Sequence, residues 1–122
     1  ALPIWLGDIQ EILDRELEFV VLDRVNSNYE TPLHLACALG HKHIVHLFLS
    51  NGADMYARDC YNNAPIHRAV SQGHVDIAEL LIREFLCNPK VKGYQGRTLL
   101  HFACGIGNIE FINTLIQTIK EA

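Results

Sequence analysis

Apolar residues recur along this chain in short paired stretches at helical spacing, and glycine or polar residues separate the stretches. Residues 33–39 read LHLACAL and are followed by Gly40, and residues 44–49 read IVHLFL and are followed by Gly52. Apolar positions three and four apart predict one buried face of a helix. Glycine just past a helix end favours the left-handed backbone that terminates it. The stretch therefore predicts two short helices joined by a tight turn.

The residues around the first of these helices support the same interpretation. Thr31 is a favourable N-cap, and Pro32 at the first helical position gives up an N–H that would lack a partner in any case. Residues 54–63 are mostly polar and follow the second helix, so they predict a protruding turn. The expected packing side of the first helix consists of Leu33, Leu35, Ala36 and Cys37.

The pattern then returns twice. Residues 64–82 and 98–116 can be placed over residues 31–54 with steps of 33 and then 34 residues, so one residue is inserted between the second and third copies. A fixed period in this range predicts a stack of small units that bury a continuous core between them. The residues in register are His34, His67 and His101; Ala36, Ala69 and Ala103; and Gly40, Gly73 and Gly107.

The T-P-L-H-x-A element at residues 31–36 and the Gly-His element at residues 40–41 resemble the ankyrin repeat, and the resemblance covers roughly residues 28–120. It implies an all-α helical-repeat solenoid with protruding β-hairpin-like turns. The shared histidine near each threonine would then join the loops of adjacent repeats by hydrogen bonds. The expected divisions are a partial N-terminal unit at 1–27 and repeats at 28–61, at 62–95 with the inserted residue, and at 96–122.

Three positions depart from the pattern. Ala64 replaces the threonine, which removes an N-cap oxygen that contributes about 1 kcal/mol in typical hosts. Leu99 stands where proline is expected, and Asn108 replaces the histidine of the Gly-His element. The connection at 84–95 carries the inserted residue together with Pro89, so we expect it to differ most from a regular hairpin. Apolar residues on the last helix favour further repeats beyond it, although a modestly polar end face is the alternative.

Charge and composition narrow the class of partner. A net charge of −4 argues against a basic footprint for nucleic acid, and no apolar run approaches the roughly 20 residues that span a bilayer. Cys37 and Cys104 occupy one repeat position where Val70 stands in the middle copy, so we expect packing thiols rather than disulfides. Reduced thiols predict an intracellular protein of the cytoplasm or nucleus. We expect a protein partner, and a monomer or a part of a larger chain.

Histidines raise the alternative of a metal site. His43 and His46 lie three apart on one helix face, and with His41 or Cys37 they could hold zinc. A solvated helix face explains them equally well, and the chain has no CxxC or HxxxH pair. It also has no G-x-S-x-G elbow and no phosphate-binding glycine loop. We therefore expect neither an enzyme nor a cofactor.

The remaining candidate is a surface, because positions that vary between stacked repeats are free for a partner. The resemblance implies that the turn tips and the inner face of each first helix form a concave groove. Tyr61 and Tyr94 are its expected anchors, and Arg68 stands out because Leu35 and Phe102 occupy its position in the other copies. The candidate partner-binding residues are Leu39, Tyr61, Asn63, Arg68, Ser71, Gln72, Tyr94, Gln95, Arg97 and Ile106.

The sequence thus favours a protein–protein interaction module that binds its partner through this groove without catalysis. The alternative is a structural spacer, a segment of a longer repeat array that positions neighbouring domains. The two hypotheses differ in whether the groove is occupied by another protein or stays open to solvent.

Overall fold

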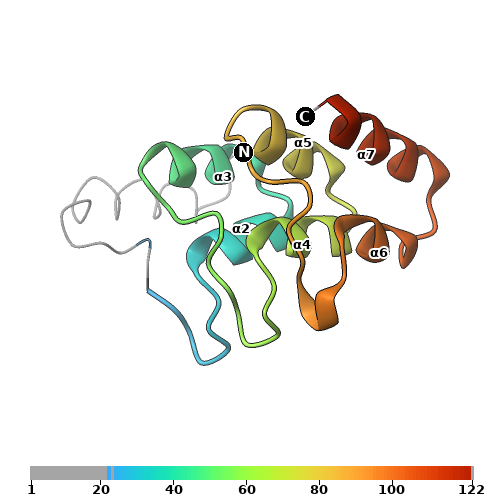
Figure 1. The fold of residues 1–122 in the computed structure, drawn as a ribbon. Helices are drawn as coiled ribbons and strands as arrows, with labels where there is room; N and C mark the ends of the chain where they lie inside the picture. The colour runs from blue at the N-terminus through green and yellow to red at the C-terminus, as the bar shows by residue number, and fades with distance from the viewer. Residues whose placement is uncertain (1–21, 23, 122) are drawn as a thin grey trace.

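The computed structural model describes residue 22 and residues 24–121, and the regular elements within that part of the chain are all helical. The all-α prediction is confirmed (Figure 1). Most of the predicted partial unit at 1–27 lies outside the described residues. The elements are α2 (Pro32–Leu39), α3 (Lys42–Ser50), α4 (Pro65–Ser71), α5 (Val75–Arg83), a 3-10 turn η3 (Tyr94–Gly96), α6 (Leu99–Cys104) and α7 (Ile109–Glu121).

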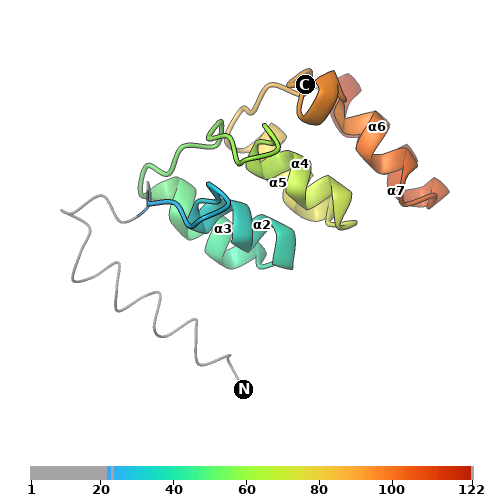
Figure 2. The ribbon, with the colours of Figure 1, turned by 90° about the horizontal axis from the view of Figure 1, so that it is seen from below.

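The helices form two layers. Helices α2, α4 and α6 stack in one layer, and α3, α5 and α7 stack in the other (Figures 1 and 2). Each helix of the first layer also contacts the helix that follows it in the chain, which gives three helix pairs. The loops that precede α2, α4 and α6 project away from both layers, as Figure 1 shows. We call α2, α4 and α6 the inner helices and these loop ends the tips.

Local sequence sets the helix ends as expected. The Thr31 hydroxyl accepts a hydrogen bond from the His34 backbone N–H at 3.3 Å, whereas Ala64 has no side-chain cap. Gly40 ends α2 with a φ of +81°, a left-handed conformation that favours glycine. A Cβ at Gly40 would also lie 2.6 Å from Cε1 of His74, so the first turn packs directly against the second.

The core lies between the two helical layers and runs through all three pairs. Leu33, Ile66 and Ile77 are essentially inaccessible to solvent, as are Leu81 and Leu115. The small side chains of Ala36, Ala69 and Ala103 are buried on the inner helices, where they permit close helix packing. Burying each of the large apolar side chains stabilises the fold by roughly 1.5–3 kcal/mol. Leu35 was expected on this packing side, and that placement is wrong, because 40% of its surface is exposed.

The tips are hairpin-like turns, each closed by a backbone hydrogen bond at the corresponding position. The bonds run from Asn26 N to Glu30 O, from Asp59 N to Asn63 O and from Gly93 N to Arg97 O, at 2.8–3.1 Å. A further bond from Cys60 N to Asn28 O joins the first two tips. The third tip differs from the other two, since it contains the 3-10 turn η3. In the part of the chain that the structure describes, no tip residue is assigned to a β-strand.

The side of α6 that faces away from α4 is exposed to solvent, whereas the corresponding sides of α2 and α4 are buried. Leu33 and Ile66 are 1% and 0% exposed, but Leu100 at the equivalent position is 37% exposed. Cys104 was expected at a buried packing position, and this is wrong, since the residue is exposed. The reason is that α2 is covered by α4 and α4 by α6, whereas no described helix stacks on the far side of α6.

Candidate functional site

The buried histidine of the first repeat joins it to the second repeat, as expected of this position. Nδ1 of His34 accepts a hydrogen bond from the Thr31 backbone N–H at 3.1 Å. Nε2 must therefore carry the proton, and it donates to the Asn63 carbonyl oxygen at 2.8 Å. His67 likewise accepts from the Ala64 N–H at Nδ1, but its Nε2 donates to the Val91 carbonyl at 3.1 Å, which lies in the connection before the third tip and not at the position that corresponds to Asn63. These buried side chains are fully engaged in holding the stack and are not available to a partner.

A hollow of about 340 Å³ opens beside the first two tips and α4. Residues of both tips line it, and the Cys60 N to Asn28 O bond holds these tips together. Four of the predicted site residues are among those that line it. The lining residues are Asn28, Glu30, Asp59, Cys60, Tyr61, Asn63, Arg68 and Ser71.

Three charged groups sit in this hollow. Nη1 of Arg68 donates to Oε2 of Glu30 at 2.5 Å and to Oδ2 of Asp59 at 3.3 Å. The hydrogen bond from Asn26 is the largest cause that holds the pKa of Glu30 below its usual value; burial opposes it, and Arg68 adds to it. Glu30 therefore stays ionised at neutral pH. We call Glu30, Asp59 and Arg68 the charged cluster.

Asp59 also shapes its own tip. Its side chain is inaccessible to solvent, and Oδ1 accepts hydrogen bonds from the backbone N–H groups of Tyr61 and Asn63 at 2.9 and 3.0 Å. A carboxylate that accepts backbone N–H groups in this way fixes a turn. The same residue thus holds Tyr61 at the tip and orients Arg68 on the neighbouring helix.

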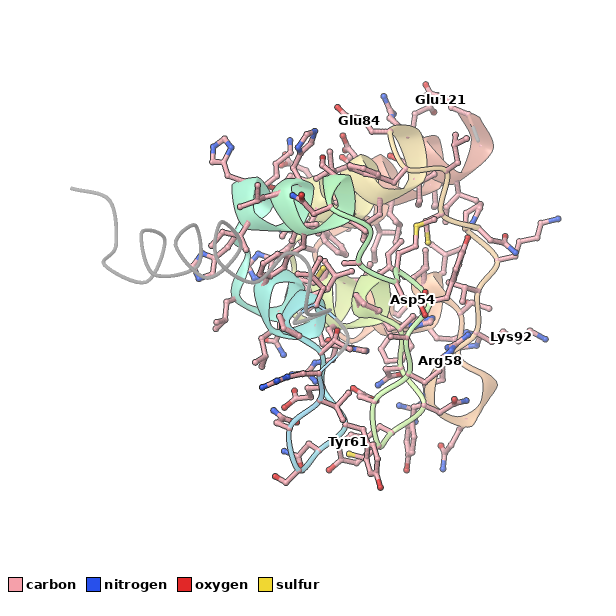
Figure 3. All side chains as sticks on the ribbon, turned by 90° about the vertical axis from the view of Figure 1, so that its left-hand side faces the viewer. Asp54, Arg58, Tyr61, Glu84, Lys92 and Glu121 are labelled. Atoms are coloured by element: carbon pink, nitrogen blue, oxygen red, sulfur yellow. The ribbon has the colours of Figure 1, made fainter. Side chains whose placement is uncertain are left out.

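Aromatic side chains occupy the second and third tips. The rings of Tyr61 and Tyr94 meet edge to face, with centroids 6.1 Å apart, and the Arg97 guanidinium carbon lies 5.3 Å from the centre of the Tyr94 ring. Tyr61 lies at the end of its loop, on the side of the molecule opposite Glu84 and Glu121 (Figure 3). The structure therefore brings together three of the predicted residues as one exposed group.

A second set of predicted residues lies elsewhere. Leu39, Gln72 and Ile106 share one repeat position at or just beyond the C-terminal ends of the inner helices, and all three are exposed. Leu39 is 65% exposed, the largest value among the apolar candidates. They form a row along the stack that is separate from the tips, whereas Gln95 is exposed within the third tip.

Asn63 was expected to be an exposed contact residue, and the structure corrects this. The residue is buried, and its side-chain oxygen accepts a hydrogen bond from the Tyr94 backbone N–H at 2.8 Å. Its carbonyl accepts from His34, and its N–H donates to Asp59. Ser71 is half-buried and donates its hydroxyl to the Arg68 carbonyl at 3.0 Å. Asn63 therefore connects parts of the stack, whereas the Ser71 bond lies within α4.

Sequence reasoning missed two residues, one in the charged cluster and one on the first tip. Asp59 was not recognised, although an arginine at a position that elsewhere holds leucine and phenylalanine favours a nearby carboxylate when it is partly buried. Tyr29 was also missed, and it stands 61% exposed on the first tip with a φ of +59°. Strained backbone conformations of this kind are enriched at functional sites, but the φ angle of Tyr29 is not readable from the sequence.

Among residues 22 and 24–121, no three histidine, cysteine, aspartate or glutamate side chains gather closely enough to hold a metal ion. Within the same residues, no helix combines the length and apolar character needed to cross a bilayer.

Comparison with known protein families identifies the family of the chain. A model of ankyrin repeats in three copies matches residues 7–93, and a single ankyrin repeat model matches residues 95–120. The chain belongs to the ankyrin repeat family. Ankyrin repeats are protein–protein interaction modules.

Curated relatives carry the ankyrin repeat within much longer proteins. The E3 ubiquitin-protein ligase XBAT33 of Arabidopsis thaliana is 38% identical over 70% of this chain, which corresponds to 17% of the relative's length. Rabankyrin-5 of Mus musculus is 38% identical over 63% of the chain and 6% of its own length. The transient receptor potential cation channel subfamily A member 1 of Homo sapiens is 26% identical over 90% and 10%, respectively. The chain thus spans less than a fifth of these relatives.

Proposed function

We propose that this ankyrin domain binds a partner protein through the face formed by the tips and the inner helices, and that it carries out no catalysis itself. We call this the inner face, and it corresponds to the concave groove expected of the family. The free state of the described cysteines supports a cytoplasmic or nuclear setting, because oxidising compartments favour disulfides.

The observation that supports the proposal is that the histidine and alanine positions shared by the first two repeats are buried, whereas several positions that differ between repeats are exposed. The invariant histidines of the first two repeats are buried and use both ring nitrogens within the stack. The positions that differ between repeats, such as Leu39, Tyr61 and Tyr94, are instead exposed. Exposed apolar side chains that gather on one face favour interaction with another protein.

The tips offer the best anchors on this face. Tyrosine and arginine are enriched among the residues that dominate binding energy, and tyrosine supplies a large rigid contact at small entropic cost. Tyr61 and Tyr94 already support each other, and Arg97 is stacked against Tyr94. Such preorganisation reduces the ordering cost of binding.

Affinity capture from cytosol tests the proposal. The native chain is compared with a tip variant, Tyr61→Ala with Tyr94→Ala, and with a helix-end variant, Leu39→Glu with Ile106→Glu. Leu86→Glu is the matched control, because Leu86 is 79% exposed and lies outside the inner face. Circular dichroism checks that each variant is folded, and any retained protein is purified and titrated against all four chains.

We expect one partner to bind the native chain and the Leu86→Glu control equally. The tip variant should bind it at least about tenfold more weakly, which corresponds to about 1.4 kcal/mol. A partner that binds all four chains with one affinity would place the interface elsewhere. Failure of the native chain to retain any protein would favour the spacer function.

A further inference from the structure

Arg68 has donors that the fold does not use. Its Nη1 makes both contacts to the charged cluster, with Glu30 and with Asp59. Neither Nε nor Nη2 has an acceptor among the residues that the structure describes. The side chain is 25% exposed and lines the hollow beside the first two tips. An oriented arginine with free donors in a hollow points to a ligand that accepts hydrogen bonds.

The geometry of the guanidinium limits what that ligand can be. Arginine donors form a rigid planar fork, so fixing one nitrogen fixes the direction of the others. The two carboxylates hold Nη1 from two different tips, and Asp59 is itself fixed by the backbone N–H groups of its own tip. The unused donors are therefore preorganised, and the matching ligand is one or two oxygen acceptors in a plane.

The net charge of the charged cluster indicates whether the acceptor group of the ligand is a carboxylate or a neutral group. Glu30 and Asp59 already place two negative charges on one guanidinium, which leaves the cluster at −1. A third carboxylate would be repelled at this partly buried site, where water screens charges poorly. A carbonyl oxygen of a peptide backbone or of an amide side chain accepts the same hydrogen bonds without that repulsion. A basic side chain next to it would be attracted to the cluster and could lie on the exposed ring of Tyr61.

The neighbouring inner helices determine which residues flank Arg68 along the inner face. Leu35 on α2 and Phe102 on α6 occupy the position of Arg68 in the first and third repeats, and both are at least partly exposed. Along the inner face, the order is therefore apolar, polar, apolar. A partner segment that places a carbonyl at Arg68 would meet apolar surface on either side.

We propose that the hollow binds an extended, basic peptide segment of the partner, with Arg68 donating to a carbonyl oxygen of that segment. Glu30 and Tyr61 receive the basic side chain beside it. This rests on the proposed function and names the chemistry of the partner that the inner face accepts. The surface is specific to the middle repeat, because only α4 carries the arginine.

Selection from a library of random 12-residue peptides displayed on phage tests the inference with the whole 122-residue chain. The variant is Arg68→Lys, which keeps a positive charge between the carboxylates but lacks the guanidinium fork. The control is Arg83→Lys, because Arg83 pairs with Glu121 on α5 and α7, away from the hollow. Thermal unfolding establishes that both variants remain folded.

We expect the selected peptides to be enriched in lysine and arginine and depleted in aspartate and glutamate. The consensus peptide should bind Arg68→Lys at least tenfold more weakly than it binds the native chain or Arg83→Lys. Replacing its backbone amides one at a time by esters, whose carbonyls are weaker acceptors, should weaken binding at one position in the native chain and at none in Arg68→Lys.

Three results would overturn the inference. One is a set of acidic peptides, which would show that Arg68 reads a carboxylate. Another is equal affinity for the native chain and Arg68→Lys. The third is a library that yields no peptide, because an extended segment should suffice for binding. None of these would remove the proposed function, since the captured partner and the tip variant test it separately.

Discussion

Nε2 of His34 donates a hydrogen bond to the backbone carbonyl of Asn63 at 2.8 Å, and this single contact links the start of one inner helix to the tip of the next repeat. Nδ1 of the same ring accepts from Thr31 within its own repeat. One side chain thus satisfies a buried donor and a buried acceptor on two repeats. Its counterpart His101 keeps the bond to the Thr98 N–H but is exposed to solvent.

This relationship predicts that equivalent histidines differ in their contribution to stability. His34→Phe leaves the Thr31 N–H and the Asn63 carbonyl buried without a partner, at a cost of about 1–3 kcal/mol for each group. His101→Phe should lower the free energy of unfolding by less than His34→Phe, since water reaches the Thr98 N–H. Urea unfolding followed by circular dichroism measures both. Equal losses of unfolding free energy in the two variants would show that the bond between His34 and Asn63 adds no stability beyond the bond to the Thr31 N–H.

The same histidines predict a dependence of stability on pH. Burial is the largest cause that lowers the pKa of His34 and of His67, and hydrogen bonds to backbone carbonyls oppose it. In the unfolded chain these pKa values return to about 6.5. Below that pH the unfolded state therefore binds more protons than the folded state, so acid favours unfolding. Protonation of Nδ1 would also abolish the hydrogen bond from the Thr31 N–H to His34 and the one from the Ala64 N–H to His67.

We accordingly expect the free energy of unfolding to be nearly constant above about pH 7 and to fall between roughly pH 6.5 and pH 5. Urea titrations at half-unit intervals of pH measure this fall. In a variant with His34→Gln and His67→Gln the fall should be smaller over the same interval, although the variant is less stable overall. A fall of the same size in that variant would assign it to other groups.

Two glycines of the third tip should respond to alanine for different reasons. Gly96 has a φ of +72° and open space around an added Cβ, so Gly96→Ala should lower the free energy of unfolding by about 1 kcal/mol through backbone strain alone. Gly93 has a φ of −110°, but its added Cβ would lie 2.4 Å from Oδ1 of Asn63. Gly93→Ala should therefore cost about 1–3 kcal/mol through overpacking.

A double-mutant cycle with Asn63→Ala separates the two causes. In that background the cost of Gly93→Ala should fall, because the obstructing oxygen is gone, whereas the cost of Gly96→Ala should not change. An unchanged cost for Gly93→Ala would mean that the nearby ring of His67, whose Cγ would be 3.0 Å away, sets the limit.

The sequence by itself determined the repeat and the helices. The period of 33 and 34 residues, the Thr31 cap and the glycine after α2 are local features, because they depend on residues a few positions apart. The family and the all-α fold follow from them, as does the inter-repeat role of His34.

Only the tertiary structure decided which side chains are accessible and which charges meet. Burial depends on the element that packs from outside, so equivalent residues differ: Cys37 is buried under the next repeat and Cys104 is exposed. Asn63 became an internal connector because residues 29 and 31 positions away in sequence bond to it. Arg68 meets Glu30 across 38 residues for the same reason. Stacking brings such residues together, and periodicity within one repeat carries no information about partners that lie in the next.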